Sequence, residues 1–540
     1  MSVGTVASPA ASQPVAPPRR TAASVISHPV TLAVLALTAL AAVLRFYRLG
    51  HQGFWFDEAN TAQLVHFSLG KMLGLIPQTE STPPLYYCVA WAWARVFGYG
   101  EAGLRSLSAV AGVLTVPVAY GAGARLVSRP RASGPLGVQP RLNRPRASHP
   151  AGLIVAALCA CNPFLIWYSQ EARSYALLVL FSALALLSFA LVLDRPTPRH
   201  VALWVVCSAL ALATHYYAVV VVVPQAAWLL VRLRDDRAVQ AGLAVVALCG
   251  LALIPLALSQ HSTGHDSWIA HSDLGVRLRQ IIPQFLIGTD APARTLLKFL
   301  GLALALVGLG LLGLRRRLPE GRRALLALGL AATGFVISLA FIAAGSDALI
   351  TRNIIGLWLP AAIAVAAGLA LARPRVVGAV VAAGLCGIGV AAAVGVATNY
   401  KFQRPNWRVV AQELGPRPTA GSDRLILIQH YRTLLPLSLY LPHLHFVPGR
   451  GVAGVRELDV VAFSSPQQPL CWWGAACNLI PSRMQASYHV PGFHPLWLRR
   501  VRQFTIMRLV SDRPRHVTPA SVSRALHTTS LPRDELLRQR

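Results

Sequence analysis

Long apolar runs separated by short polar segments make up most of the chain between residues 29 and 396. Each run is close to the roughly 20 residues that an α-helix needs to cross a bilayer. The short alternating segments typical of a membrane β-barrel do not occur. Eleven spans are therefore predicted, without an internal repeat. They are 29–47, 103–124, 150–168, 174–193, 200–214, 217–231, 238–259, 295–314, 324–344, 354–372 and 376–396.

Arginines gather in every second connection between these spans. Arg19 and Arg20 precede the first span. The later basic connections are 125–146, 195–199, 232–237, 315–323 and 373–375. Because short basic loops stay in the cytoplasm, the pattern predicts a multi-pass protein of the cytoplasmic membrane. Its amino terminus lies inside and its carboxyl terminus outside.

One more apolar segment, 83–98, is predicted to lie on the outer membrane surface without crossing it. It opens with two prolines and is rich in tyrosine and tryptophan, which suit the headgroup level. Counting it as a span would place the connection 125–146, with its six arginines, on the outside and invert every later assignment.

Beyond the membrane domain, 29–397, the pattern changes to mixed elements. A helix over 407–414 and a buried strand over 424–429 predict a small extracytoplasmic α/β domain, residues 398–512. Residues 1–28, rich in Ala, Pro, Ser and Thr, are predicted to be a disordered cytoplasmic tail. Residues 513–540 are predicted to be a basic tail.

Composition supports a membrane protein. Hydrophobic residues make up 54% of the chain and charged residues only 13%, whereas a soluble domain carries about 25% charged residues. The formal charge of +30 comes almost wholly from arginine. Since many arginines lie in the loops where topology requires them, nucleic acid is not an expected partner. The predicted fold class is an all-α polytopic membrane protein with a small outer α/β domain.

The few acidic residues point to a site at the outer surface, because most of them fall there in this layout. The candidates are Asp57, Glu58, Glu80 and Glu171, with Arg173, His215 and Arg352 at outer ends of spans. Any one of them alone would be more often structural. Their convergence on one face indicates a functional site.

The stretch GFWFDEAN, residues 53–60, carries two adjacent carboxylates after an aromatic triplet. Asp57 has two readings. It could cap the helix predicted to follow, or it could act as a general base held against apolar rings. Local chemistry leaves both open.

Four segments together resemble the glycosyltransferase family 39 group, which has the GT-C fold and includes protein O-mannosyltransferases and the lipid A aminoarabinose transferase. The segments are 45–65, 81–120, 163–180 and 214–225. They contain Asp-Glu, Pro-Pro-Leu-Tyr-Tyr, Ser-Gln-Glu-Ala-Arg-Ser-Tyr and Thr-His-Tyr in that order. The segment 351–368 is similar to a late span of these proteins, with Asn353 in place of tyrosine. Thr82 also departs from the histidine or lysine often found before the two prolines.

The resemblance implies transfer of a sugar, mannose- or arabinose-like, from a polyprenyl-phosphate donor. The acceptor would be a protein, glycolipid or glycan at the outer face, among membrane lipids. It favours Asp57 as the base, with Glu58 beside it in the catalytic pair. Arg173 and Arg352 suit the donor phosphate, because guanidinium binds phosphate in a bidentate way. Glu80, Glu171 and His215 would support them. The sequence leaves a divalent cation at these acidic and histidine side chains as an alternative.

A polytopic transporter or flippase of lipid-linked glycans is the main competing function, and a noncatalytic receptor or scaffold is a third. A transporter would place ionisable residues near the bilayer midplane, often in repeated halves. Neither feature is found. In the outer domain, Cys471 and Cys477 are predicted to form a disulfide in the oxidising exterior. A soft metal site is the rival there, although no further ligands complete it.

Overall fold

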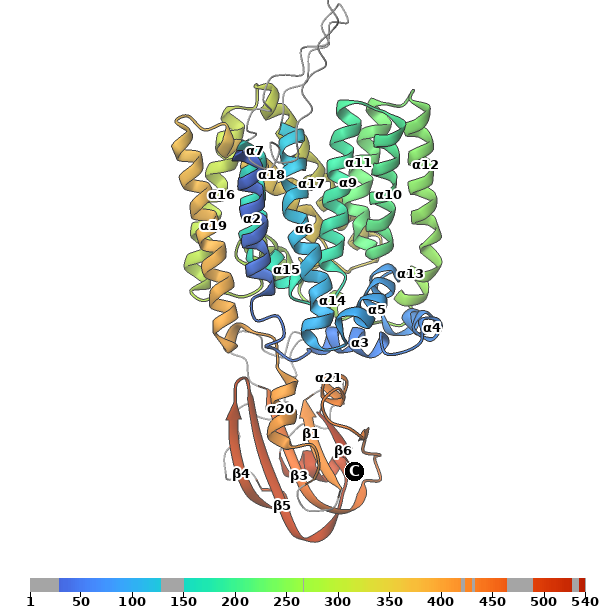
Figure 1. The fold of residues 1–540 in the computed structure, drawn as a ribbon. Helices are drawn as coiled ribbons and strands as arrows, with labels where there is room; N and C mark the ends of the chain where they lie inside the picture. Colours follow the sequence, from blue (N-terminus) through green and yellow to red (C-terminus); the bar gives the residue numbers. More distant parts are fainter. Residues whose placement is uncertain are drawn as a thin grey trace, which may run out of the picture.

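The computed structural model describes residues 29–127, 150–265, 267–418, 423–429, 433–463, 489–526 and 534–539. They form a bundle of long helices and a small domain built on a β-sheet, which lies beyond one end of the bundle (Figure 1). This arrangement confirms the predicted fold class, a helical membrane domain followed by a small α/β domain.

Seven helices in the described residues are long and apolar enough to cross a membrane, or eight if one bent pair counts as a span. The seven are α2 (Pro29–Phe46), α6 (Glu101–Val127), α9 (Tyr175–Asp194), α12 with α13 (Arg237–His261), α16 (Arg294–Leu314), α17 (Pro319–Ala343) and α19 (Arg375–Thr398). The bent pair is α7 (Pro150–Cys161) and α8 (Pro163–Ser169). Three shorter apolar helices are α10 (Pro198–Thr214), η1 with α11 (Tyr216–Arg232) and η2 with α18 (Ile355–Ala370). Each of the eleven predicted spans thus corresponds to a helix.

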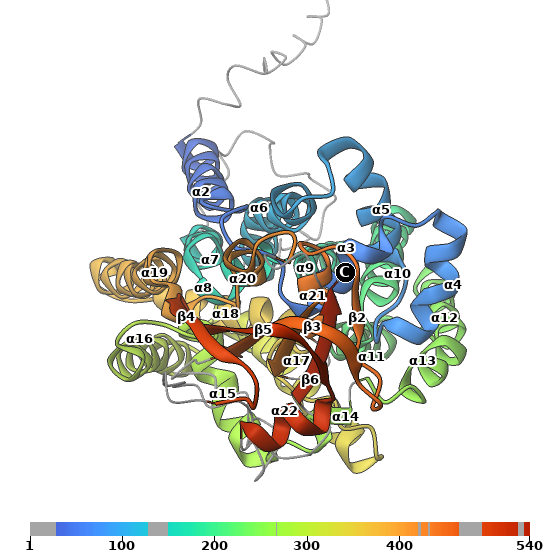
Figure 2. The ribbon, with the colours of Figure 1, turned by 90° about the horizontal axis from the view of Figure 1, so that it is seen from below.

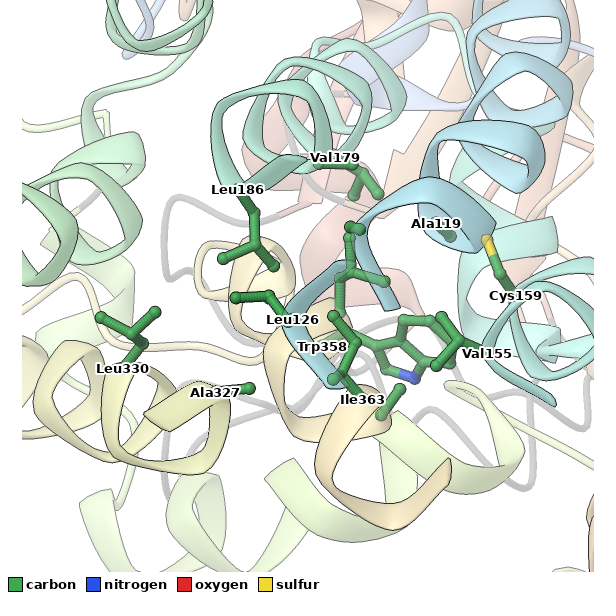
Figure 3. Close-up of a cluster of buried hydrophobic side chains, with 14 of the residues drawn as sticks. Ala119, Leu126, Val155, Cys159, Val179, Leu186, Ala327, Leu330, Trp358 and Ile363 are labelled. Carbon is green, nitrogen blue, oxygen red and sulfur yellow. The ribbon is translucent and has the colours of Figure 1, made fainter. Parts of the chain in front are cut away.

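The bundle core is made from α6, α7, α9, α17 and α18, whose side chains interlock in Figure 3. It contains many small residues, which let helix backbones approach closely in a membrane. Gly368 shows why. A Cβ atom at this position would collide with the Gly308 carbonyl, so α18 and α16 can cross here only because both residues are glycine.

Three helices lie across the end of the bundle that faces the sheet domain: α3 (Phe56–Leu64), α4 (Leu69–Thr79) and α5 (Leu85–Phe97) (Figures 1 and 2). The apolar segment 83–98 therefore forms a short helix beside the end of the bundle, in agreement with the prediction that it does not span. Two further helices, α14 (Ser267–Ala270) and α15 (Leu274–Ile287), lie at the same end.

The small domain follows α19 through η3 (Tyr400–Phe402). Its sheet has the order β2-β6-β1-β3-β5-β4, in which only β1 and β3 are parallel. The strands are β1 (Arg424–Gln429), β2 (Leu444–Phe446), β3 (Val452–Phe463), β4 (His494–Val501), β5 (Phe504–Val517) and β6 (Asp534–Gln539). The predicted helix 407–414 and strand 424–429 are both confirmed, as α20 (Trp407–Leu414) and β1.

Both faces of this sheet are covered. Alternate β1 residues point to opposite sides. Ile426 packs with α20 and α21 (Leu434–Ser438), and Leu427 packs with α22 (Pro519–Ala525). The predicted boundary at residue 512 is corrected, because β5 continues to Val517 and β6 pairs with both β1 and β2. The chain after 512 completes the sheet, which a loose basic tail could not do.

Candidate active site

The predicted site residues lie in four connections that are far apart in sequence. Asp57 and Glu58 lie on α3, Arg173 lies between α8 and α9, and His215 lies between α10 and η1. Arg352 lies in the segment between α17 and η2. Successive spans alternate in direction, so all four connections meet at the end of the bundle that faces the sheet domain (Figure 1).

Asp57 forms an ion pair with Arg352, with 3.0 Å between Oδ2 and Nη1. The Asp57 side chain is 18% exposed and that of Arg352 is 19% exposed. Within the described part of the chain, Oδ1 of Asp57 has no hydrogen-bond partner. Trp55 occupies the N-cap position of α3 without a side-chain cap bond. Asp57 is therefore not a helix cap, and its carboxylate faces the partly open site.

Arg352 is held by its surroundings on several sides. Its guanidinium lies 5.7 Å from the ring centres of both Tyr175 and Trp268. Its segment is fastened by Arg277, which binds both carboxylate oxygens of Asp347 at 2.7 Å. The Nε atom of Arg352 is buried and has no partner among the described residues. Arg352 thus offers a fixed cation with hydrogen-bonding capacity to spare.

Glu58 is fully buried and bound on both oxygens. Arg105 donates to Oε1 and Oε2 at 2.7 and 2.6 Å, and the Ala172 amide donates to Oε1 at 2.8 Å. Burial alone would raise the pKa of Glu58, but the Arg105 guanidinium outweighs it and holds this pKa below its usual range. Arg105 also binds the carbonyls of Leu49, Gln52 and Gly53. Glu58, predicted as a catalytic partner of Asp57, therefore fastens the start of α3, which carries Asp57, to α6.

Glu80 and Arg173 form a second buried pair. Arg173 Nη1 lies 3.1 and 2.9 Å from the two Glu80 oxygens and 3.3 Å from the Asp57 carbonyl. Asn60 donates to Glu80 at 2.7 Å. Burial raises the pKa of Glu80 in spite of Arg173. Arg173, predicted to bind the donor phosphate, is thus engaged in supporting α3, and its Nε is buried without a partner among the residues that the structure describes.

Glu171 pairs with Arg404, which comes from the connection into the sheet domain. The distance from Arg404 Nη2 to Glu171 Oε2 is 2.8 Å. The other Glu171 oxygen is buried without a partner in the described chain. Burial raises the pKa of Glu171, Arg404 lowers it, and the nearby carboxylates of Glu58 and Asp57 raise it further. Glu171 is therefore a buried residue that supports the site through Arg404.

His215 lies beside this group with its ring 5.7 Å from the ring of Tyr175. Its Nδ1 accepts a hydrogen bond from the Tyr217 amide at 3.2 Å. Burial, with Arg173 and Arg352 nearby, lowers the pKa of His215 to about 3. The imidazole is neutral at physiological pH, so it orients aromatic neighbours and adds no positive charge for a phosphate.

The donor set does not fit a divalent cation. In the described residues, no three His, Cys, Asp or Glu side chains group closely enough to hold a metal ion. Asp57, Glu58, Glu80 and Glu171 each face an arginine. A cation would have to displace these guanidinium groups.

The predicted disulfide between Cys471 and Cys477 lies outside the described residues.

The sheet domain holds the loop in front of Asp57. Tyr440 Oη accepts from the Phe54 amide at 2.7 Å and donates to Glu101 at 2.8 Å. Asn406 Oδ1 accepts from the Gly53 amide at 3.0 Å, and Arg408 donates to the carbonyl of His51 at 2.8 Å. A side chain on Gly53 would collide with Asn406 and Arg408. The domain therefore forms part of the site's framework.

Sequence reasoning missed Arg105 and Arg404, although a signal for both was present. Each is an arginine at the end of the bundle that the sequence predicts to face outward, where the topology rule makes basic residues uncommon. Each turned out to neutralise a buried glutamate, Glu58 and Glu171 respectively. An arginine that the sequence predicts at the outer end of a span therefore indicates a buried ion pair.

The fold is that of two solved structures. The chain superimposes on ArnT from Cupriavidus metallidurans bound to undecaprenyl phosphate, with TM-score 0.53 and 14% sequence identity, over 88% of this chain and 98% of that one. The apo state of the same enzyme gives TM-score 0.52 and 12% identity, over 89% and 98%. The S. cerevisiae Pmt1-Pmt2 O-mannosyltransferase complex bound to the sugar donor matches 45% of this chain and 34% of that one, with TM-score 0.31 and 16% identity. No protein-family model and no curated protein sequence matches the chain. The protein thus has the GT-C-type fold that the sequence predicted.

Proposed function

We propose that the protein is a glycosyltransferase that moves a sugar from a polyprenyl-phosphate carrier to an acceptor at the outer face of the cytoplasmic membrane. The sugar is a hexose or pentose of the mannose or arabinose type, and the acceptor is a protein, glycolipid or glycan. The observation that carries the proposal is the pair Asp57–Arg352, an accessible carboxylate and an accessible guanidinium 3.0 Å apart. The same fold is found in a protein bound to undecaprenyl phosphate.

The chemistry needs one base and one anion-binding group. Asp57 takes the proton of the acceptor's attacking group as that group attacks the anomeric carbon. The bond between this carbon and the carrier phosphate breaks, and its electron pair leaves with the phosphate. Arg352 stabilises the developing negative charge. Attack from the face opposite the leaving group inverts the anomeric centre.

The other carboxylates do not fit the role of base. Glu58, Glu80 and Glu171 are buried, and each is bound by an arginine. A general base must come within hydrogen-bond reach of the proton it removes. Of the four, Asp57 is the one that solvent and an acceptor can reach. The remaining pairs Glu58–Arg105, Glu80–Arg173 and Glu171–Arg404 position the loops around it.

A transporter or flippase receives less support. Such a protein needs ionisable groups along a path across the membrane. In the described spans, acidic and basic side chains lie within the first or last two turns of their helices, as Arg45, Arg105 and Lys298 do. The charged groups thus mark the ends of the bundle and leave its middle apolar.

The proposal is tested with the purified full-length protein in proteoliposomes. The assay supplies labelled polyprenyl-phosphate mannose or arabinose on the side of the sheet domain, with an envelope extract as acceptor. Transfer of label to the extract supports the glycosyltransferase. Movement of intact labelled donor across the bilayer, with no transfer to any acceptor, would establish a flippase and overturn the proposal.

A further inference from the structure

A pocket lies beside the proposed active site, and Asp57 and Arg352 do not line it. It is formed where the end of α2, α8, the segment 288–290 and the end of α19 meet. Asp57, Arg173, His215 and Arg352 are not among its lining residues. The buried pair Glu171–Arg404 connects the two places, since Arg404 lines the pocket and Glu171 lies at the site.

The pocket has two kinds of wall. Pro163 and Ile166 of α8 and Val396 near the end of α19 give it an apolar side. Arg48, Thr289 and Arg404 give it a polar side. Figure 2 shows α2 and α19 at the margin of the bundle, where a helix of a membrane protein borders lipid. A molecule with a lipid tail and a polar headgroup would match this combination.

Three residues that line the pocket each carry a buried polar atom that lacks a partner among the described residues. These atoms are Gln52 Oε1, Thr289 Oγ1 and Arg404 Nε, none of which makes a hydrogen bond within the described chain. The Arg404 side chain is only 6% exposed. A buried donor or acceptor without a partner costs free energy. Three such groups on residues that line one hollow are the reason to consider a bound molecule there.

The charge around the pocket is mainly positive. Arg48 and Arg502 both contact Nε2 of His51 and, in the described residues, form no ion pair with a carboxylate. Burial and the arginines Arg48, Arg502 and Arg408 lower the pKa of His51, which leaves its ring neutral and able to accept from them. Asp290 is the one acid in the lining, and its Oδ1 accepts from the Ala291 amide.

We propose that this pocket binds the phosphate headgroup of a membrane lipid, with Arg48 and Arg404 as its cationic ligands and Thr289 as a neutral donor. Guanidinium and hydroxyl groups are strong donors to phosphate oxygens. The apolar wall receives the first part of the acyl chains. A bound lipid would satisfy the orphaned donors and brace the connection through Arg404 to Glu171. The site is separate from the donor site and does not depend on the proposed reaction.

The test uses the full-length protein in a phosphate-free detergent with added lipid. Native mass spectrometry measures retention of phosphatidylglycerol against a phosphate-free galactosyl diacylglycerol, and a thermal-shift assay measures the effect of inorganic phosphate. The wild-type protein should retain phosphatidylglycerol preferentially. Arg48→Gln should weaken retention about tenfold, and Thr289→Val should weaken it less. Arg95→Gln, which removes an exposed arginine from α5 at the same end of the bundle, is the matched control and should leave retention unchanged.

The two assays distinguish a lipid headgroup from free inorganic phosphate as the ligand. Retention of phosphatidylglycerol that depends on Arg48, without any shift by inorganic phosphate, assigns the pocket to a lipid. A shift by inorganic phosphate that is lost in Arg48→Gln shows that the phosphate group alone is enough and removes the lipid from the proposal. The proposal is overturned if the wild-type protein retains both lipids equally, or if Arg48→Gln and Arg95→Gln lose the same amount of phosphatidylglycerol retention. Thr289→Val keeps every charge, so it remains informative if Arg48→Gln fails to fold.

Discussion

The Asp57 carboxylate and the Arg352 guanidinium lie 295 residues apart in the chain and 3.0 Å apart in space. Their contact joins the two groups that the proposed reaction must use separately. While Arg352 binds Asp57, the carboxylate is neutralised and one of its oxygens is occupied. A phosphate offers more charge and more acceptor oxygens than a carboxylate. Donor binding would therefore draw Arg352 away and free Asp57 to accept a proton.

This exchange predicts an unusual effect on donor binding. Asp57→Asn removes the competitor for Arg352, so it should bind polyprenyl phosphate as tightly as the wild-type protein or a few-fold more tightly. Arg352→Met should weaken binding by about tenfold or more. Arg352→Lys should have an intermediate affinity, because lysine keeps the positive charge but cannot bind phosphate in a bidentate way. Calorimetric titration with polyprenyl phosphate measures all three. If Asp57→Asn binds as poorly as Arg352→Met, the two residues do not compete in this way.

Glu58 should prove to be a structural residue. Glu58→Gln leaves Arg105 as an uncompensated buried charge, so the unfolding free energy should fall by about 3 kcal/mol. Since the folded-state pKa of Glu58 lies below the usual range, its stabilisation is present above the unfolded carboxyl pKa and is lost on acidification. Thermal unfolding of the two proteins should therefore differ most near neutral pH and converge in acid. A difference that grows as the pH falls contradicts this assignment.

The sheet domain should control activity through Tyr440. Tyr440→Phe removes the acceptor for the Phe54 amide and the donor to Glu101, each bond being worth about 1 kcal/mol. We expect kcat to fall several-fold while the KM for the donor changes little, because Arg352 is untouched. Arg499→Gln breaks an exposed pair with Glu413 in the same domain and is the control. Equal activities of the two variants would show that the domain does not position the loop.

Much of this fold was readable from the sequence because a membrane imposes a simple pattern. Each predicted span corresponds to a helix of the structure, and the predicted helix 407–414 and strand 424–429 are also present. The end of the domain was not predicted, since β6 is a short strand whose partners, β1 and β2, precede it by many residues.

The site could be predicted only in part, for a related reason. The sequence identified Asp57 and Arg352 and predicted both at the same end of the bundle, in agreement with their contact. It did not show that Arg105 would bind Glu58 or that Arg404 would bind Glu171, because ion pairs between distant segments leave no local pattern. Burial decides which carboxylate can act as a base, and burial depends on the assembled bundle.

The orientation in the membrane is a further prediction. The sheet domain should face outward and the ends of α16 and α17 near Arg315 should face the cytoplasm, following the positive loops. A cysteine introduced at Arg450 should react with an impermeant thiol reagent on intact cells, and one at Arg315 should react only after permeabilisation. The opposite result would reverse the sides and remove the outer face as the place of reaction.

The most direct measurement of the central claim is sugar transfer by Asp57→Asn. The substitution keeps the size of the side chain and its place on α3, but asparagine cannot take a proton. Expression, membrane insertion and polyprenyl-phosphate binding should stay near those of the wild-type protein. Transfer should fall by a factor on the order of 10² to 10⁴. If Asp57→Asn transfers sugar at the rate of the wild-type protein, Asp57 is not the general base, and the account of the site is contradicted.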